Sequence, residues 1–281
     1  MMFNFLIYLF IFVFGTICGS FLNCVIYRLA LPSFSLKNLG GLKGRSYCPH
    51  CKHILDWRDL IPIFSFLILR GRCRYCSQKI SWQYPLVEIA TGLLFLSIFN
   101  FQFSRPEGAR LAQLYWAAIF NLIIACFLII IFVYDLKHYI IPDKVIYPAI
   151  ALTFLYQLIS NFLPHQIFGG GSIFKYLILS ALGSAAFFLT IVLISRGKWM
   201  GVGDIKLALL MGLFLSFPNI LVALFLAFFI GALTGLILIA FSKKTLKSEI
   251  PFGPFLVTGT FLAMFFGQKL IDTYLNLFLL K

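Results

Sequence analysis

Long apolar runs separated by polar segments dominate this chain. A helix needs about 20 predominantly apolar residues to cross a bilayer, because each residue adds 1.5 Å along its axis. Eight runs of roughly this kind occur, at residues 3–27, 85–100, 112–134, 145–163, 173–195, 205–217, 219–241 and 251–268. The pattern predicts about eight transmembrane helices, of which the second is marginal and the sixth is short.

The interval 28–84 is the one stretch polar enough to fold in water. We therefore divide the chain into a first transmembrane helix (1–27), a polar insert (28–84), the second and third transmembrane helices (85–134) and a core of the remaining helices (135–281). Of all 281 residues, 61% are hydrophobic and 11% are charged. Soluble domains carry about 25% charged residues, so a soluble protein is excluded. The expected fold class is an all-α polytopic membrane protein with a small polar insert.

Positive charge is unevenly distributed among the connections. The chain has 23 Lys and Arg against 9 Asp and Glu, a net charge of +14. The connections 28–84, 135–144, 196–206 and 242–249 share one side of the membrane if eight helices are counted, and they hold 18 of the 23 basic residues. Basic loops remain in the cytoplasm, so this asymmetry predicts an amino terminus outside and an insert inside. The excess charge then indicates orientation, and no nucleic-acid partner is expected.

Four cysteines of the insert form two Cys-x-x-Cys knuckles, Cys48-Pro49-His50-Cys51 and Cys73-Arg74-Tyr75-Cys76, with 21 residues between them. Two such knuckles supply the four thiolates of a tetrahedral structural zinc site, which leaves no open position for chemistry. Reduced thiols without metal and a pair of disulfides are the alternatives, and a cytoplasmic location disfavours the disulfides. His50 and His53 are expected to be exposed polar residues. The remaining cysteines lie in apolar runs, where we expect small core residues: Cys18, Cys24 and Cys126.

Acidic residues are costly at membrane depth and indicate functional sites there. Asp135 ends the third run, and Asp204 opens the sixth within Gly201-Val202-Gly203-Asp204. Both fall on the predicted cytoplasmic boundary, where two carboxylates on different helices suit acid/base activation of a water molecule. Gly201 and Gly203 permit close approach of backbone or a positive φ. Lys206 is placed either to lower the pKa of Asp204 or to meet lipid phosphates.

Other interpretations of the acidic residues stay open at this point. Asp135 and Asp204 are also compatible with helix ends without a catalytic role, Asp204 being a suitable cap. Asp143 suits the N-cap of the fourth run, and Glu88 suits either a pair with a basic residue of the insert or the lining of a cavity. A proton- or cation-coupled transporter is a further alternative, although transporters place such acids near the midplane. The other acids are expected to be solvated: Asp56, Asp59, Glu107, Glu249 and Asp272.

Short motifs occur in a characteristic order along nearly the whole chain. They are Gly19-Ser20-Phe21-Leu22-Asn23, Tyr27-Arg28-Leu29, both knuckles, Leu69-Arg70-Gly71-Arg72-Cys73-Arg74, Tyr84-Pro85-Leu86-Val87-Glu88, Asp135 with Ile141-Pro142-Asp143, Gly201-Val202-Gly203-Asp204-Ile205-Lys206-Leu207 and Ile250-Pro251-Phe252-Gly253-Pro254-Phe255. In this order they resemble the type IV prepilin leader peptidases and N-methyltransferases, which are membrane aspartyl proteases with a Gly-x-Gly-Asp motif.

The resemblance implies an enzyme with two activities in the bacterial inner membrane. It implies cleavage of the basic cytoplasmic leader of type IV prepilins or type II secretion pseudopilins, followed by S-adenosylmethionine-dependent methylation of the new α-amine. It also implies that Asp135 and Asp204 are the catalytic aspartates, and that metal binds the four knuckle cysteines. The methyl donor is expected at the insert. Helix polarity leads us to expect Asp204 to be the more ionised acid and Asp135 to carry a shared proton.

Overall fold

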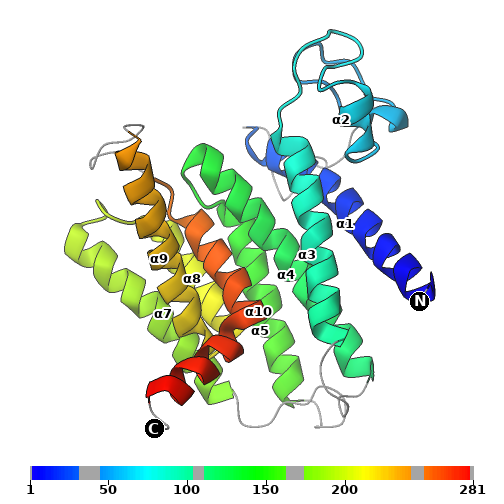
Figure 1. Ribbon diagram of the computed structural model, residues 1–281. Helices are drawn as coiled ribbons and strands as arrows, with labels where there is room; N and C mark the ends of the chain where they lie inside the picture. The colour runs from blue at the N-terminus through cyan, green and yellow to red at the C-terminus, as the bar shows by residue number, and fades with distance from the viewer. Residues whose placement is uncertain (1, 32–44, 104–110, 163–173, 242–249, 279–281) are drawn as a thin grey trace. The chain divides into compact units, whose positions relative to one another are not determined.

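The described part of the chain is mainly helical, apart from the turns and loops of the insert. The computed structural model describes residues 2–31, 45–103, 111–162, 174–241 and 250–278 (Figure 1). The helices are α1 (Met2–Leu29), η2 (Trp57–Asp59), α2 (Phe64–Ile68), α3 (Gln83–Phe103), α4 (Leu111–His138), α5 (Asp143–Phe162), α7 (Phe174–Ser195), α8 (Val202–Leu215), α9 (Asn219–Ala240) and α10 (Gly253–Phe278). Eight helices of 14 to 28 residues coincide with the eight predicted runs, and the last continues past its predicted end at residue 268. Within these ranges, β pairing is limited to two isolated bridges in the insert.

Six of the described helices are long and apolar enough to cross a membrane, judged by length and composition. They comprise α1, α3, α4, α7, α9 and α10. The marginal second run is therefore a full-length helix, α3, of 21 residues. Helix α8 has 14 residues, which gives it a length of about 21 Å, shorter than a bilayer core of about 30 Å.

The chain divides into two compact units, Met1–Ile130 and Ile131–Lys281, with the division inside α4. In the first unit, α1 packs against α3 (Figure 1), and glycines lie at the contact. A Cβ added at Gly15 would lie 2.8 Å from Gly92 Cα, and one at Gly19 would lie 2.8 Å from Glu88 Cα. Glycines at such contacts allow two helix backbones to approach closely, which is how helices associate where no water is available to drive them together.

In the second unit, α8 is surrounded by α5, α7, α9 and α10. Leu207, Ala208, Leu210 and Met211 are completely buried, so α8 is apolar on all sides. Surrounding helices cover it in place of lipid, and this explains how a helix shorter than the bilayer is accommodated.

Two serines of α7 attach α8 to its neighbour. Ser180 Oγ donates a hydrogen bond to the Gly212 carbonyl oxygen and Ser184 Oγ donates one to that of Ala208, each over 2.9 Å. A Cβ added at Gly212 would lie 2.5 Å from Ala181 Cα and 2.7 Å from the Ser180 carbonyl oxygen. The backbones of α7 and α8 are therefore in direct contact here, and this contact fixes the position of α8.

Gly212→Ala is expected to destabilise the protein by about 1–3 kcal/mol, because the added methyl group must push two helix backbones apart. Thermal unfolding in detergent would measure the effect. Gly183→Ala in α7 is the matched control, since no atom lies within 4 Å of the Cβ it would add. Equal melting temperatures for the two variants would contradict the close packing of α7 and α8.

Candidate functional site

Asp135 lies in the last turn of α4 and is 5% exposed. Its carboxylate accepts a hydrogen bond from the backbone N–H of Gly253, the first residue of α10. A Cβ added at Gly253 would lie 2.5 Å from Asp135 Oδ2. The absence of a side chain at residue 253 therefore allows the backbone of α10 to reach the carboxylate.

Asp204 lies in the first turn of α8 and is 8% exposed. Its Oδ2 accepts a hydrogen bond of 3.2 Å from the N–H of Gly201, the N-cap residue. The carboxylate thus caps its own helix through this oxygen. Gly201 has a φ of −82° rather than a positive value, and Gly203 serves close packing, since a Cβ there would lie 3.1 Å from Ile141 Cβ.

The fold brings these two aspartates together from different helices. Both belong to the unit Ile131–Lys281, both are buried, and they lie near enough for an electrostatic interaction between their side chains. The two carboxylates are 69 positions apart in the chain, and the fold places them in the same region of the second unit, at the end of α4 and the start of α8. Such a pair can bind a water molecule and exchange protons with it.

The four knuckle cysteines also come together, in the other unit. Their sulfur atoms all lie within 4.8 Å of one another, and Cys48 Sγ is 3.8 Å from Cys76 Sγ. A tetrahedral zinc ion with bonds of about 2.3 Å to sulfur separates its ligands by about 3.8 Å. All four are free thiols rather than disulfides. The donor set therefore fits a zinc ion, while His50 and His53 are exposed as expected.

The two knuckles repeat the same backbone pattern. The N–H of Cys48 donates to the His53 carbonyl over 3.0 Å, and the N–H of Cys73 donates to the Gln78 carbonyl over 2.8 Å. The residue after each second cysteine has a positive φ, 58° at Lys52 and 57° at Ser77. Burial raises the pKa of Cys48, but hydrogen bonds from the Cys51 and His50 backbone outweigh burial and lower the pKa to about 7. The backbone of this knuckle thus favours the thiolate of Cys48, which is the form that binds metal.

Two family models match separate parts of the chain. The bacterial peptidase A24 N-terminal domain matches residues 13–101, which include all four knuckle cysteines, and the type IV leader peptidase family matches residues 122–236, which include Asp135 and Asp204. The prepilin leader peptidase/N-methyltransferase of Aeromonas hydrophila is 30% identical over 96% of this chain and 94% of its own length. The chain belongs to the type IV leader peptidase family. Proteins with the same name from Stutzerimonas stutzeri and Bacillus subtilis are each 30% identical, over 94% and 95% of this chain and 92% and 97% of their own lengths. No solved structure matches the chain.

In this member of the type IV leader peptidase family, Lys206 pairs with Asp143 rather than with Asp204. Its Nζ donates a hydrogen bond to Asp143 Oδ1 over 2.5 Å and lies 4.9 Å from the centre of the Tyr147 ring. Asp143 is the first residue of α5. Lys206 therefore joins the start of α8, two residues from Asp204, to the start of α5.

Among the described residues, Glu88 contacts a backbone amide of the insert and a serine side chain of α1. It is 6% exposed, and its Oε2 accepts a 2.7 Å hydrogen bond from the N–H of Ile63. Ser20 of α1 also contributes a side-chain hydrogen bond to this carboxylate. Glu88 thus links α1, α3 and the insert. The sequence could not predict this contact, because the partner atom is a main-chain amide and leaves no residue signature.

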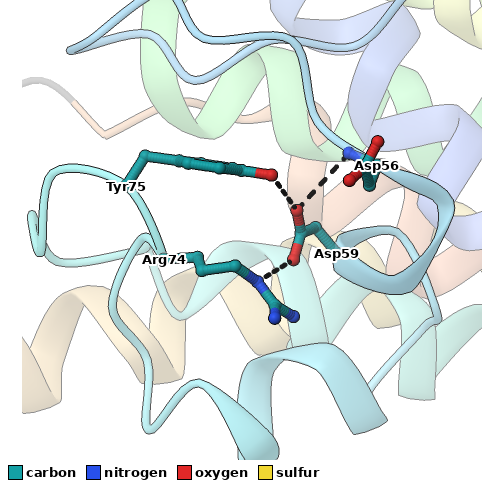
Figure 2. Close-up of polar contacts among 4 residues, drawn as sticks. All are labelled: Asp56, Asp59, Arg74 and Tyr75. Atoms are coloured by element: carbon teal, nitrogen blue, oxygen red, sulfur yellow. Dashed lines mark hydrogen bonds and ion pairs between the residues drawn. The ribbon is translucent and has the colours of Figure 1, made fainter.

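Asp59 is not solvated, contrary to the expectation for the loop acids. Its side chain is 3% exposed and accepts hydrogen bonds from Arg74 Nε over 2.8 Å and from the Tyr75 hydroxyl over 3.3 Å (Figure 2). These partners are the two inner residues of the second knuckle, so Asp59 fixes that loop. Asp56 and Asp272 are exposed as expected, whereas Glu107 and Glu249 lie outside the described residues.

Proposed function

We propose that this chain cleaves the leader peptide from type IV prepilins or type II secretion pseudopilins and then methylates the new amino terminus. The observation that carries the proposal is the buried pair of carboxylates, Asp135 and Asp204, in the unit that matches the leader peptidase model. The names of the relatives agree with both activities. A transporter that uses the same pair finds no support among these relatives.

The proposed cleavage uses one ionised and one protonated carboxyl group. A water molecule between Asp135 and Asp204 gives a proton to the ionised group while its oxygen attacks the scissile carbonyl carbon. The protonated group donates its proton to the carbonyl oxygen, and a tetrahedral intermediate forms. When the C–N bond breaks, the leaving amine takes the proton received from water and the second carboxyl group regains its own.

The helix ends favour different protonation of the two acids. Asp204 lies at a helix N-terminus, where the macrodipole favours negative charge, and Asp135 lies at a C-terminus, where it does not. We therefore assign the shared proton to Asp135 in the resting enzyme. Infrared titration of the two single Asp→Asn variants tests this assignment, and a higher carboxyl pKa in the variant that retains Asp204 would contradict it.

The proposed location is the bacterial inner membrane, with the amino terminus outside and the active site at the cytoplasmic face. The distribution of basic residues supports this orientation. It presents the carboxylate pair at the boundary where the apolar helix of a prepilin meets its cytoplasmic leader. The proposed partners are thus prepilin substrates and membrane lipid.

Methylation is proposed for the insert, 28–84, with S-adenosylmethionine as the donor of the methyl group. The knuckle cysteines would hold a structural zinc ion: Cys48, Cys51, Cys73 and Cys76. That ion would supply no chemistry of its own, because four thiolates complete its coordination.

The proposal is tested with the purified full chain in detergent and a synthetic prepilin. The expected products are a shortened pilin and, with S-adenosylmethionine present, a methylated amine, both observed by mass spectrometry. Cleavage that persists at the wild-type rate in Asp135→Asn would overturn the aspartyl mechanism. Loss of cleavage on chelation in an otherwise folded protein would favour a metal-dependent reaction instead.

Gly253→Ala is expected to lower the cleavage rate by about 10²-fold, because displacement of a catalytic group by about 1 Å has a cost of that order. The added methyl group would overlap Asp135 Oδ2. Gly201→Ala is the matched control beside the other carboxylate, since its Cβ would lie 3.9 Å from Asp204 Oδ2, an ordinary contact. Turnover of the synthetic prepilin measures both variants, and equal rates would contradict the proposed role of the α10 backbone.

A further inference from the structure

Helix α2 of the insert exposes a row of large apolar side chains. Phe64, Leu67 and Ile68 are 64%, 62% and 73% exposed, and their spacing places them on one face of the helix. Leu60 and Ile61, just before the helix, are 38% and 37% exposed. A contiguous apolar surface of this kind indicates a contact with a partner or a membrane.

The opposite side of α2 is packed. Phe66 lies 4.9 Å from Trp82 between ring centroids, and its ring is the nearest group to a Cβ built at Gly71. Helix α2 therefore already packs one partly buried apolar side chain within the insert. The row formed by Phe64, Leu67 and Ile68 is a second apolar face without a partner among the described residues.

The exposed row is tied to a membrane-spanning helix. Ile63, immediately before α2, donates its N–H to Glu88 Oε2 over 2.7 Å. Glu88 is the sixth residue of α3, one of the six candidate spans, and so lies about 7.5 Å along the axis from the start of that helix. The segment that carries the row thus meets α3 within its first two turns.

The segment before the row is fixed to the second knuckle. Asp59 binds Arg74 and Tyr75 of that knuckle, and its Oδ2 also accepts a 3.4 Å hydrogen bond from the backbone N–H of Asp56 (Figure 2). The path from Asp59 to Ile63 is therefore anchored at the cysteine cluster and at α3. Because this segment is held at both ends and leads directly into α2, the apolar face of α2 has a defined direction.

The surroundings of the row suit a lipid boundary. Leu86, Ile89 and Leu93 on α3 are 60%, 36% and 53% exposed, as expected of the outward face of a helix in lipid. Trp82 is 70% exposed just before α3, and tryptophan is enriched where membrane meets water. The exposed basic residues nearest α2 in the sequence would attract anionic headgroups: Arg58, Arg70 and Arg72.

We propose that Phe64, Leu67 and Ile68 insert between the headgroups and acyl chains of the bilayer that α1 and α3 span. This contact holds the cysteine insert against the membrane surface. Lipid is favoured over a second copy of the chain or an apolar substrate segment, because the row is tied to α3 and the exposed basic residues nearest to it in the sequence complement anionic headgroups. The contact requires no substrate and is present in the resting protein.

Tryptophan quenching by lipid bromine tests the proposal in the full chain reconstituted in phosphatidylglycerol and phosphatidylethanolamine vesicles. Trp57, Trp82, Trp116 and Trp199 are replaced by Phe, and one reporter is introduced as Phe64→Trp. The matched control is His50→Trp, at an exposed residue of the first knuckle. Lipids brominated near the carbonyl end of the acyl chain are expected to quench the reporter at residue 64 at least about twofold more than the one at residue 50.

Three results would overturn the lipid contact. Equal quenching at the two reporters would place the row in water. Protection of residue 64 from aqueous acrylamide without lipid quenching would indicate a second copy of the chain. Protection that arises only after a synthetic prepilin is added would indicate the substrate as the occupant.

A second measurement leaves the four native tryptophans in place. A benzoylphenylalanine at Leu67 in the otherwise native chain is expected to crosslink phospholipid on illumination, and one at His50 is not. Crosslinking of lipid to the same extent from both residues, or from neither, would contradict the proposal.

Discussion

Replacement of Asp204 by Asn is expected to lower the rate of leader cleavage by about 10²- to 10⁴-fold, the range observed when a general acid or base is removed. Asparagine keeps the size of the side chain, and its amide oxygen can accept the same hydrogen bond from the Gly201 N–H. The variant should therefore fold and lose only the ability to exchange a proton. Single-turnover cleavage of a synthetic prepilin by the purified protein measures the loss.

Asp143→Asn is the matched control for this experiment. Asp143 is also an aspartate of the second unit and contacts Lys206, two residues from Asp204, but its side chain is 59% exposed. Loss of an exposed ion pair changes stability by about 1 kcal/mol or less, so cleavage should remain within several-fold of the wild-type rate. A larger loss in Asp143→Asn than in Asp204→Asn would contradict the assignment of the catalytic pair.

Removal of the metal is expected to unfold the insert and abolish methylation. Structural zinc supplies about 10–16 kcal/mol to small metal-dependent folds, and the insert has few buried apolar residues besides its cysteines. Cys73→Ser should therefore lose bound zinc, expose residues 45–82 to protease and stop methyl transfer to a pre-cleaved pilin. Cleavage should be affected less, since Asp135 and Asp204 belong to the other compact unit.

Cys18→Ala is the control, because Cys18 lies in α1 outside the knuckles. Elemental analysis is expected to find one zinc ion per chain in this variant and in the wild type. Limited proteolysis and transfer of a labelled methyl group complete the comparison. Zinc retained at full occupancy in Cys73→Ser would contradict the four-cysteine site.

The sequence predicted the helices well because the apolar runs are separated by charge and proline. Asp143 and Gly253 begin helices where such signals occur, directly after Pro142 and close to Pro251. The knuckle cysteines and the acids were also recognisable, because few residues of these types occur in the chain. The four cysteines meet in space as their motifs suggested, and the two acids lie within range of an electrostatic interaction.

Three contacts could not be predicted because they depend on tertiary structure. The partner of Asp135 is the main-chain N–H of Gly253, which is 118 positions away. Asp59 is buried by a knuckle that begins 14 positions later, and Lys206 turns toward Asp143 rather than Asp204. A short-range pattern identifies a helix or a knuckle, but it does not specify which loop folds back onto it.

The two carboxylates differ in what holds them. Asp204 is fixed within its own helix by Gly201, whereas Asp135 is fixed from α10 through the bare backbone of Gly253. A compound that bound between α10 and the end of α4 and separated them by the width of one methyl group would break the hydrogen bond from Gly253 to Asp135. Such a compound could inactivate the enzyme without resembling a peptide and without touching either acid.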